Sequence, residues 1–161
     1  MSRKARPLIY TAVLAAAVLW YLFRPELLFV DKTVSEQHPT EISDIPSEVA
    51  LLAQGTFRGV AHETTGSAMI YRYPGGRKTL RLMNFETSNG PDVHIYLVAA
   101  PEAPDDESVK RAEVIDLGIM KGNIGDQNYD LPDDIDLKKF QTVTIWCQRF
   151  GVNFGSAPLG I

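Results

Sequence analysis

Short runs of β-forming residues, separated by turn residues, fill residues 55–159 and limit the fold more than any other feature of the chain. Prolines, glycines, asparagines and aspartates separate runs that are rich in branched and aromatic side chains. We predict a mainly β fold, an antiparallel β-sandwich of about eight short strands. The expected strands are 56–62, 67–73, 78–85, 93–98, 112–117, a short strand near 121–129, 142–148 and 152–157.

The stretch 142–154, with the sequence TVTIWCQRFGVNF, contains Cys147, the only cysteine of the chain. It predicts two strands that turn at residues 149–151, with Val143, Ile145 and Cys147 on one face. A single cysteine excludes an intramolecular disulfide and any CxxC or paired-cysteine zinc site within this chain. From spacing alone, Cys147 is either a small core residue or a reactive thiol.

An uncharged apolar run occupies residues 8–23, after Arg3, Lys4 and Arg6 and before Arg24. We expect residues 1–24 to be an uncleaved signal anchor with one transmembrane helix preceding the sandwich. A cleaved signal peptide and a soluble hydrophobic helix are the alternatives. The positive-inside rule then predicts a single-pass membrane protein with its N-terminus in the cytoplasm and its domain in the periplasm or outside the cell.

Charge is divided unevenly along the chain. Residues 1–24 have four basic residues and no acidic one, so the other residues hold a formal charge of −8 within the net −4. An acidic domain does not suit the neutralisation of phosphates, and we expect no nucleic-acid partner. Residues 25–54, polar and interrupted by Pro39 and Pro46, predict a juxtamembrane spacer with a short helix at 47–52. The domain itself is expected at residues 55–161.

Among polar residues, His62, His94, Asp92 and Cys147 are the candidates for chemistry. A Cys–His pair lowers the pKa of a thiol and makes it nucleophilic or metal-binding, so His62 and Cys147 are also a candidate metal pair. The glycine-rich run at 121–125 lacks the ending of a phosphate-binding loop. It predicts a simple turn, with a backbone nest for an anion as the alternative.

Several motifs together resemble the DM13 domain family. Gly55-Thr56-Phe57, His62 and Gly66-Ser67-Ala68 are similar to the family's opening. The other matching motifs are Leu80-Arg81-Leu82, Asn84-Phe85, Asn89-Gly90-Pro91-Asp92-Val93, Tyr96-Leu97, Asp116-Leu117-Gly118, Lys121-Gly122-Asn123-Ile124-Gly125, Gln127-Asn128-Tyr129, Leu131-Pro132, Ile145-Trp146-Cys147, Phe150 and Phe154-Gly155. The resemblance covers residues 55–159 in order. It implies a small β-sandwich and matches Cys147 to a cysteine proposed to act in redox chemistry or electron transfer.

These observations lead to one preferred function and two alternatives. We expect an exported, membrane-anchored redox or electron-transfer accessory, rather than a stand-alone enzyme, that uses Cys147 together with a redox or cell-envelope protein. The alternatives are a non-catalytic binding or adhesion module and a metal- or haem-binding domain, for which haem or copper would suit imidazole and thiolate ligands. The candidate cofactor-binding residues are His62, Trp146, Asn89 and Asp92.

Overall fold

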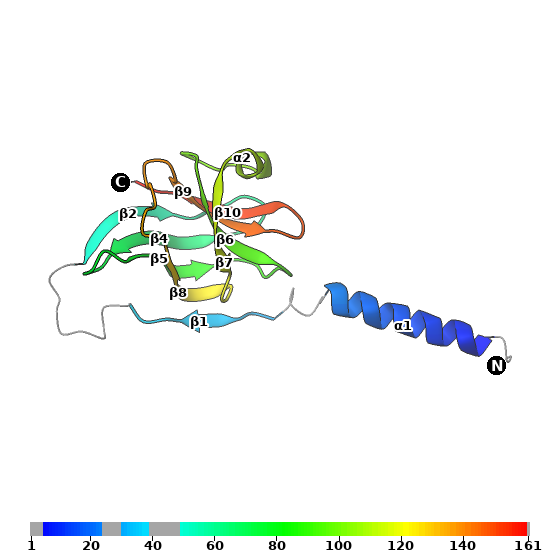
Figure 1. The fold of residues 1–161 in the computed structure, drawn as a ribbon. Helices are drawn as coiled ribbons and strands as arrows, with labels where there is room; N and C mark the ends of the chain where they lie inside the picture. The colour runs from blue at the N-terminus through cyan, green and yellow to red at the C-terminus, as the bar shows by residue number, and fades with distance from the viewer. Residues whose placement is uncertain (1–4, 24–29, 39–48, 161) are drawn as a thin grey trace.

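The structure is a computed structural model that describes residues 5–23, 30–38 and 49–160. Its described strands form two five-stranded sheets (Figure 1). The first sheet has the order β1-β8-β5-β4-β2, with β1 at Thr33–Ser35, β2 at Ala50–Thr56, β4 at Thr65–Arg72, β5 at Lys78–Glu86 and β8 at Ile124–Asp130. The second has the order β3-β10-β9-β6-β7, with β3 at Arg58–Gly59, β6 at Val93–Val98, β7 at Val114–Ile119, β9 at Thr142–Cys147 and β10 at Val152–Pro158.

The apolar side chains of both sheets meet in one core. Leu80 and Leu82 of the first sheet and Ile95 and Ile145 of the second are completely buried in the same cluster. This arrangement confirms the predicted sandwich, because each sheet covers the apolar face of the other. Pairing is antiparallel throughout, except that β1 runs parallel to β8.

The hairpin of β9 and β10 confirms the prediction for residues 142–154. The two strands pair through Val152 and Cys147, and four residues connect them. Gly151 has φ +63° in this turn, a backbone conformation that suits glycine. Because β9 is the middle strand of its sheet, each of its six residues is buried.

Helix α1, Ala5–Phe23, forms where the apolar run predicts a helix. Its side chains from Ile9 to Tyr21 are exposed. Among the residues that the structure describes, however, no helix is long and apolar enough to cross a membrane. The prediction of a transmembrane helix is therefore not supported. The physical reason is length, since sixteen uncharged residues rise roughly 24 Å, and a hydrocarbon core is about 30 Å thick.

The predicted spacer departs most from the structure. Residues 50–52 belong to β2 and not to a short helix, while residues 47 and 48 of that prediction lie outside the described residues. Residues 33–35 form β1 in the first sheet. The expected strand at 56–62 is limited to the end of β2 and the two residues of β3. The part of the chain that the structure describes thus has ten strands, against about eight predicted.

A second helix, α2 at Asp106–Arg111, lies between β6 and β7. Asp105 is its N-cap, and its side chain accepts a hydrogen bond from the Ser108 backbone N–H at 2.7 Å. The Ser108 side chain completes a capping box, which stabilises the first turn. In Figure 1 the helix lies on the side of the domain that carries β9 and β10.

Candidate functional site

Cys147 lies at the centre of the second sheet with its sulfur covered. It pairs with Val93 of β6 on one side and Val152 of β10 on the other. Its exposed fraction is 0%, and it packs in the main core cluster with Val143 and Ile145. No hydrogen bond from the thiol to a described residue is found. In the folded domain Cys147 therefore packs as a small core residue.

His62 lies in the segment between β3 and β4 and is half-buried. Its ring lies against Phe154 of β10, with 3.9 Å between the ring centroids. No described contact joins it to Cys147. No group of three or more histidine, cysteine, aspartate or glutamate side chains in the described part is placed to hold a metal ion. The covered sulfur and the imidazole packed on Phe154 do not fit a shared copper or haem site.

Trp146 points to the other face of β9, away from Cys147. It is buried in a second cluster with Val98 of β6 and Val109 of α2, so the short helix covers part of its indole. The Tyr96 ring stacks on it at 6.3 Å between centroids and 24° between planes. The two stacked rings thus connect the Trp146 indole, which is buried under α2, with the half-exposed phenol of Tyr96.

His94 is the centre of a polar cluster beside this ring pair. Its Nδ1 lies 3.0 Å from the Asp116 carboxylate of β7, and its Nε2 lies 3.3 Å from Asp92. Gln148 follows β9, and its Nε2 donates to the Tyr96 hydroxyl at 2.7 Å and to Asp116 at 2.9 Å. Asp116 thus holds the Gln148 side-chain amide in the position from which it donates to the Tyr96 hydroxyl.

Tyr96 stays protonated over a wide pH range in this setting. Burial raises the pKa of its phenol, and the carboxylates of Asp116 and Asp92 raise it further, while the hydrogen bond from Gln148 lowers it. The net shift of the pKa is upward chiefly because the phenolate would lose hydration on burial, and secondarily because its negative charge would lie close to two carboxylates. A phenol of this kind loses an electron together with its proton.

Asn89 does not lie with the other candidates. Its side-chain amide donates to the backbone carbonyl of Val30, in the segment that leads to β1. Only the first part of the glycine-rich run is a bend, since Ile124 and Gly125 begin β8. In the bend, Gln127 accepts from the Gly122 backbone N–H at 3.3 Å and donates to its carbonyl at 2.7 Å. The Tyr129 hydroxyl also donates to Gln127 at 2.8 Å. These bonds occupy polar groups that an anion would need.

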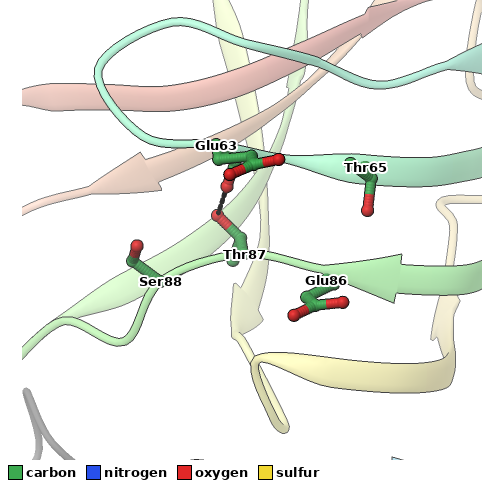
Figure 2. Close-up of a pocket in the computed structure, with 5 residues that line it drawn as sticks. All are labelled: Glu63, Thr65, Glu86, Thr87 and Ser88. Atoms are coloured by element: carbon green, nitrogen blue, oxygen red, sulfur yellow. Dashed lines mark hydrogen bonds between the residues drawn. The ribbon is translucent and has the colours of Figure 1, made fainter.

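A polar pocket of about 240 Å³ lies where β4 begins and β5 ends (Figure 2). It is lined by Glu63, Thr65, Glu86, Thr87 and Ser88. Figure 2 shows the Thr87 hydroxyl turned to the backbone carbonyl of Glu63, to which it donates at 3.3 Å. The volume is below the usual range of ligand pockets, and the lining includes neither Cys147 nor the His94 cluster.

Comparison with known proteins identifies the domain. The DM13 family, described as electron transfer DM13, matches residues 56–159, which covers the two sheets apart from β1 and most of β2. The chain belongs to the DM13 family. No curated protein and no solved structure matches it. Because the description of the DM13 family is electron transfer, a role related to redox chemistry is supported at this coarse level.

The structure brings some predicted residues of this DM13 domain together and separates others. Asp92 joins His94, and Trp146 and Cys147 are neighbours in the chain that face opposite sides of β9. His62 and Asn89 lie elsewhere. Tyr96 and Gln148 were not among the predicted site residues, although each lies two positions after a candidate, at His94 and at Trp146. Two-residue alternation on the outer face was the signal that could have found them.

Proposed function

We propose that this DM13 domain is an electron-transfer accessory and that the stacked rings of Tyr96 and Trp146 exchange electrons with a partner. The observation that carries the proposal is the stack itself, 6.3 Å between centroids, which runs from the half-exposed phenol to the residue beside Cys147. Tyrosine and tryptophan are the side chains, besides thiols, that lose one electron most readily. Their arrangement gives the domain a path from its surface inward.

The role of Cys147 follows from its burial. Thiol–disulfide exchange requires a thiolate that can reach a sulfur atom of the partner, and the folded domain covers this sulfur completely. Oxidation by electron loss would also release the thiol proton into an apolar core, where the described residues form no hydrogen bond with the sulfur. In our proposal the rings carry the electron, and the use of the single cysteine predicted from the sequence is tested separately by replacing it.

The electron and the proton of Tyr96 leave in different directions. A one-electron oxidant of the metal-centre class on the partner takes the electron and is reduced by one unit of charge. The phenolic proton passes to water at the half-exposed side of the ring, and Gln148 keeps its hydrogen bond to the oxygen. A reduced donor then returns one electron, and water returns the proton, so the domain ends unchanged.

Helix α1 supports a proposal on location. Its exposed apolar side chains, among them Val13, Leu14 and Leu19, cover no core of this domain. An exposed apolar surface of this kind is typical of a membrane or protein contact. We therefore also propose that α1 holds an exported domain at a membrane. Fractionation of cells that express the chain with and without residues 5–23 tests this part.

The test of electron transfer is a stopped-flow measurement of the full chain with hexachloroiridate(IV), a soluble one-electron oxidant. We expect Tyr96→Phe to lower the rate constant by about tenfold, because it removes the phenol and keeps the packing. Tyr71→Phe, on the outer side of β4, is the matched control and should leave the rate within about twofold. Cys147→Ala tests whether the thiol contributes, and in our proposal it leaves the rate constant unchanged. Equal rates for both tyrosine variants would contradict the proposal.

A further inference from the structure

Residues 30–38, which we call the strap, lie along β8 at the edge of the first sheet (Figure 1). The strap includes β1 and lies outside the residues that match the DM13 family. None of its residues is buried, so it adds no side chain to the core. Its attachment comes from polar contacts with the edge of the domain, together with the His38 ring, which lies 4.8 Å from the Tyr71 ring between centroids.

The strap backbone pairs with β8 as a short parallel strand. Val34 lies opposite Gly125, and the Glu36 backbone N–H donates to the Asp126 carbonyl at 3.0 Å. At the start of the strap, the Lys32 backbone N–H donates to the Asn123 side chain at 2.7 Å. The Asn123 side chain therefore binds the strap backbone just before the strand pairing begins at Thr33.

Two acidic side chains of the strap are recognised individually. Glu36 accepts from the Lys121 ammonium group at 2.8 Å and from the Asn128 backbone N–H at 2.7 Å. Asp31 accepts from the Asn123 side-chain amide at 2.8 Å. Hydrogen bonds to charged groups are about twice as strong as neutral ones. These contacts therefore select carboxylates at two positions five residues apart.

A buried arginine of the domain also faces the strap. Arg81 of β5 is 5% exposed, and its Nη1 donates to the Glu36 carbonyl at 3.0 Å. Its Nη2 donates to Asp126 at 2.6 Å, which holds the guanidinium in position. Nη1 also donates to the Asn128 side chain at 2.9 Å. The domain thus holds a nearly buried guanidinium donor in position for the strap backbone.

Two glycines shape the groove for the strap. A Cβ atom at Gly122 would lie 2.3 Å from the Lys32 carbonyl oxygen, and one at Gly125 would lie 2.0 Å from the Val34 carbonyl oxygen. No other residue type leaves room for the strap backbone at these positions. The glycine-rich run is therefore shaped to receive a peptide chain.

From this set of contacts we infer that the β8 edge is a peptide-binding groove and that the strap is its resident ligand. The ligand class is an extended acidic peptide with carboxylates five residues apart. Recognition follows the strand-addition mode, in which main-chain bonds give affinity and side-chain contacts give specificity. The same segment from a second copy of the chain fits the groove equally well, because exchange replaces each contact by an identical one. This inference does not depend on the electron-transfer proposal.

The test uses the full chain with a protease recognition sequence inserted between residues 39 and 48. After cleavage, a fluorescent peptide with the sequence of residues 30–38 is added, and its anisotropy is measured. We expect saturable binding and release of the N-terminal fragment, while the circular dichroism of the domain is unchanged. A control peptide with Asp31→Asn and Glu36→Gln should bind about tenfold or more weakly.

Three results would overturn the inference. They are no binding of the peptide to the cleaved chain, equal binding of the control peptide, and loss of the folded domain on cleavage. Hydrogen exchange of the uncut chain gives a second measurement. The amides of Lys32 and Glu36 should exchange by local opening, faster than the amides shared by β4 and β5. If the amides of Lys32 and Glu36 exchange only when the whole domain unfolds, as the amides of β4 and β5 do, the strap is an integral strand and not a bound ligand.

Discussion

Gly122→Ala provides a selective way to loosen the strap. The added Cβ would lie 2.3 Å from the Lys32 carbonyl oxygen and 2.7 Å from Cγ2 of Val34, both in the strap. Ordinary contact begins near 3.4 Å, so the strap must withdraw by about 1 Å. Gly122 does not have the positive φ that would strain an alanine, so the clash is the only direct effect.

The magnitude follows from the bonds near Lys32. Withdrawal breaks the bond from Lys32 to Asn123, the bond from the Ile124 backbone N–H to the Lys32 carbonyl, and the bond from Asn123 to Asp31. Each is worth about 0.5–1.5 kcal/mol net, and water replaces part of this at an exposed edge. We therefore expect a loss of about 1–3 kcal/mol in the free energy of closing the strap, which corresponds to roughly a tenfold to hundredfold rise in local hydrogen exchange.

The assay is hydrogen exchange of the full chain followed by mass spectrometry of peptides from residues 30–38 and 78–98. The variant should exchange faster in the first peptide and at the wild-type rate in the second. Gly118→Ala is the control, because its Cβ meets no atom within 4 Å, although its φ of +106° disfavours alanine. Unchanged exchange in residues 30–38 of Gly122→Ala would refute the reasoning, as would an equal rise in both peptides.

Three further predictions concern titration and thiol access. Burial raises the pKa of Tyr129 to about 12, so its neutral form stabilises the fold below the unfolded pKa near 10. Between pH 10 and 12, urea unfolding should therefore show a loss of about 2–3 kcal/mol that Tyr129→Phe removes. For Glu36, burial raises the pKa, but the bonds from Lys121 and Asn128 outweigh it, and the net shift is downward. Its contribution is present above the unfolded pKa and is lost as pH falls through the folded value. The protection of residues 30–38, measured as the exchange rate relative to the intrinsic rate at each pH, should therefore fall in acid, and Glu36→Gln should abolish this dependence. A thiol reagent should label Cys147 about a thousandfold more slowly in the native chain than in urea, and equal rates would contradict its burial.

Local pattern predicted much of the sandwich because its strands carry their own signals. The run from Val93 to Val98 and the hairpin around residues 149–151 show apolar side chains and turn residues that fit only one arrangement. The face shared by Val143, Ile145 and Cys147 is the core face, as the two-residue period indicates. The chain here is locally consistent with its tertiary structure.

The strap and β2 were missed because their pairing depends on distant partners. Residues 30–38 have a polar sequence, and they form a strand through pairing with β8 and through contacts with distant side chains such as Arg81 and Lys121. Residues 50–52 were assigned to a helix that begins at Ser47, but β2 pairs with β4, and that pairing overrides local preference. Helix α2 did have a local signal, since Asp105 and Ser108 form its capping box.

The candidate site was predictable only in part for a related reason. A sequence names Cys147 and His62 by residue type, but it does not tell which of them the strands bring together. Tyr96 is a candidate because its ring stacks on Trp146 and its hydroxyl accepts a hydrogen bond from Gln148, two contacts made across strands. Cross-strand neighbours depend on register, and one residue of slip would move each side chain to the opposite face.

The most direct test of the electron-transfer account is electron paramagnetic resonance of the full chain, frozen shortly after mixing with hexachloroiridate(IV). The account predicts a tyrosyl signal from Tyr96, identified by its absence in Tyr96→Phe and its persistence in Tyr71→Phe. In Tyr96→Phe the signal should move to the Trp146 indole, because the stacked ring is the next electron donor. A radical located on the Cys147 sulfur, or on tyrosines unrelated to this stack, would contradict the account.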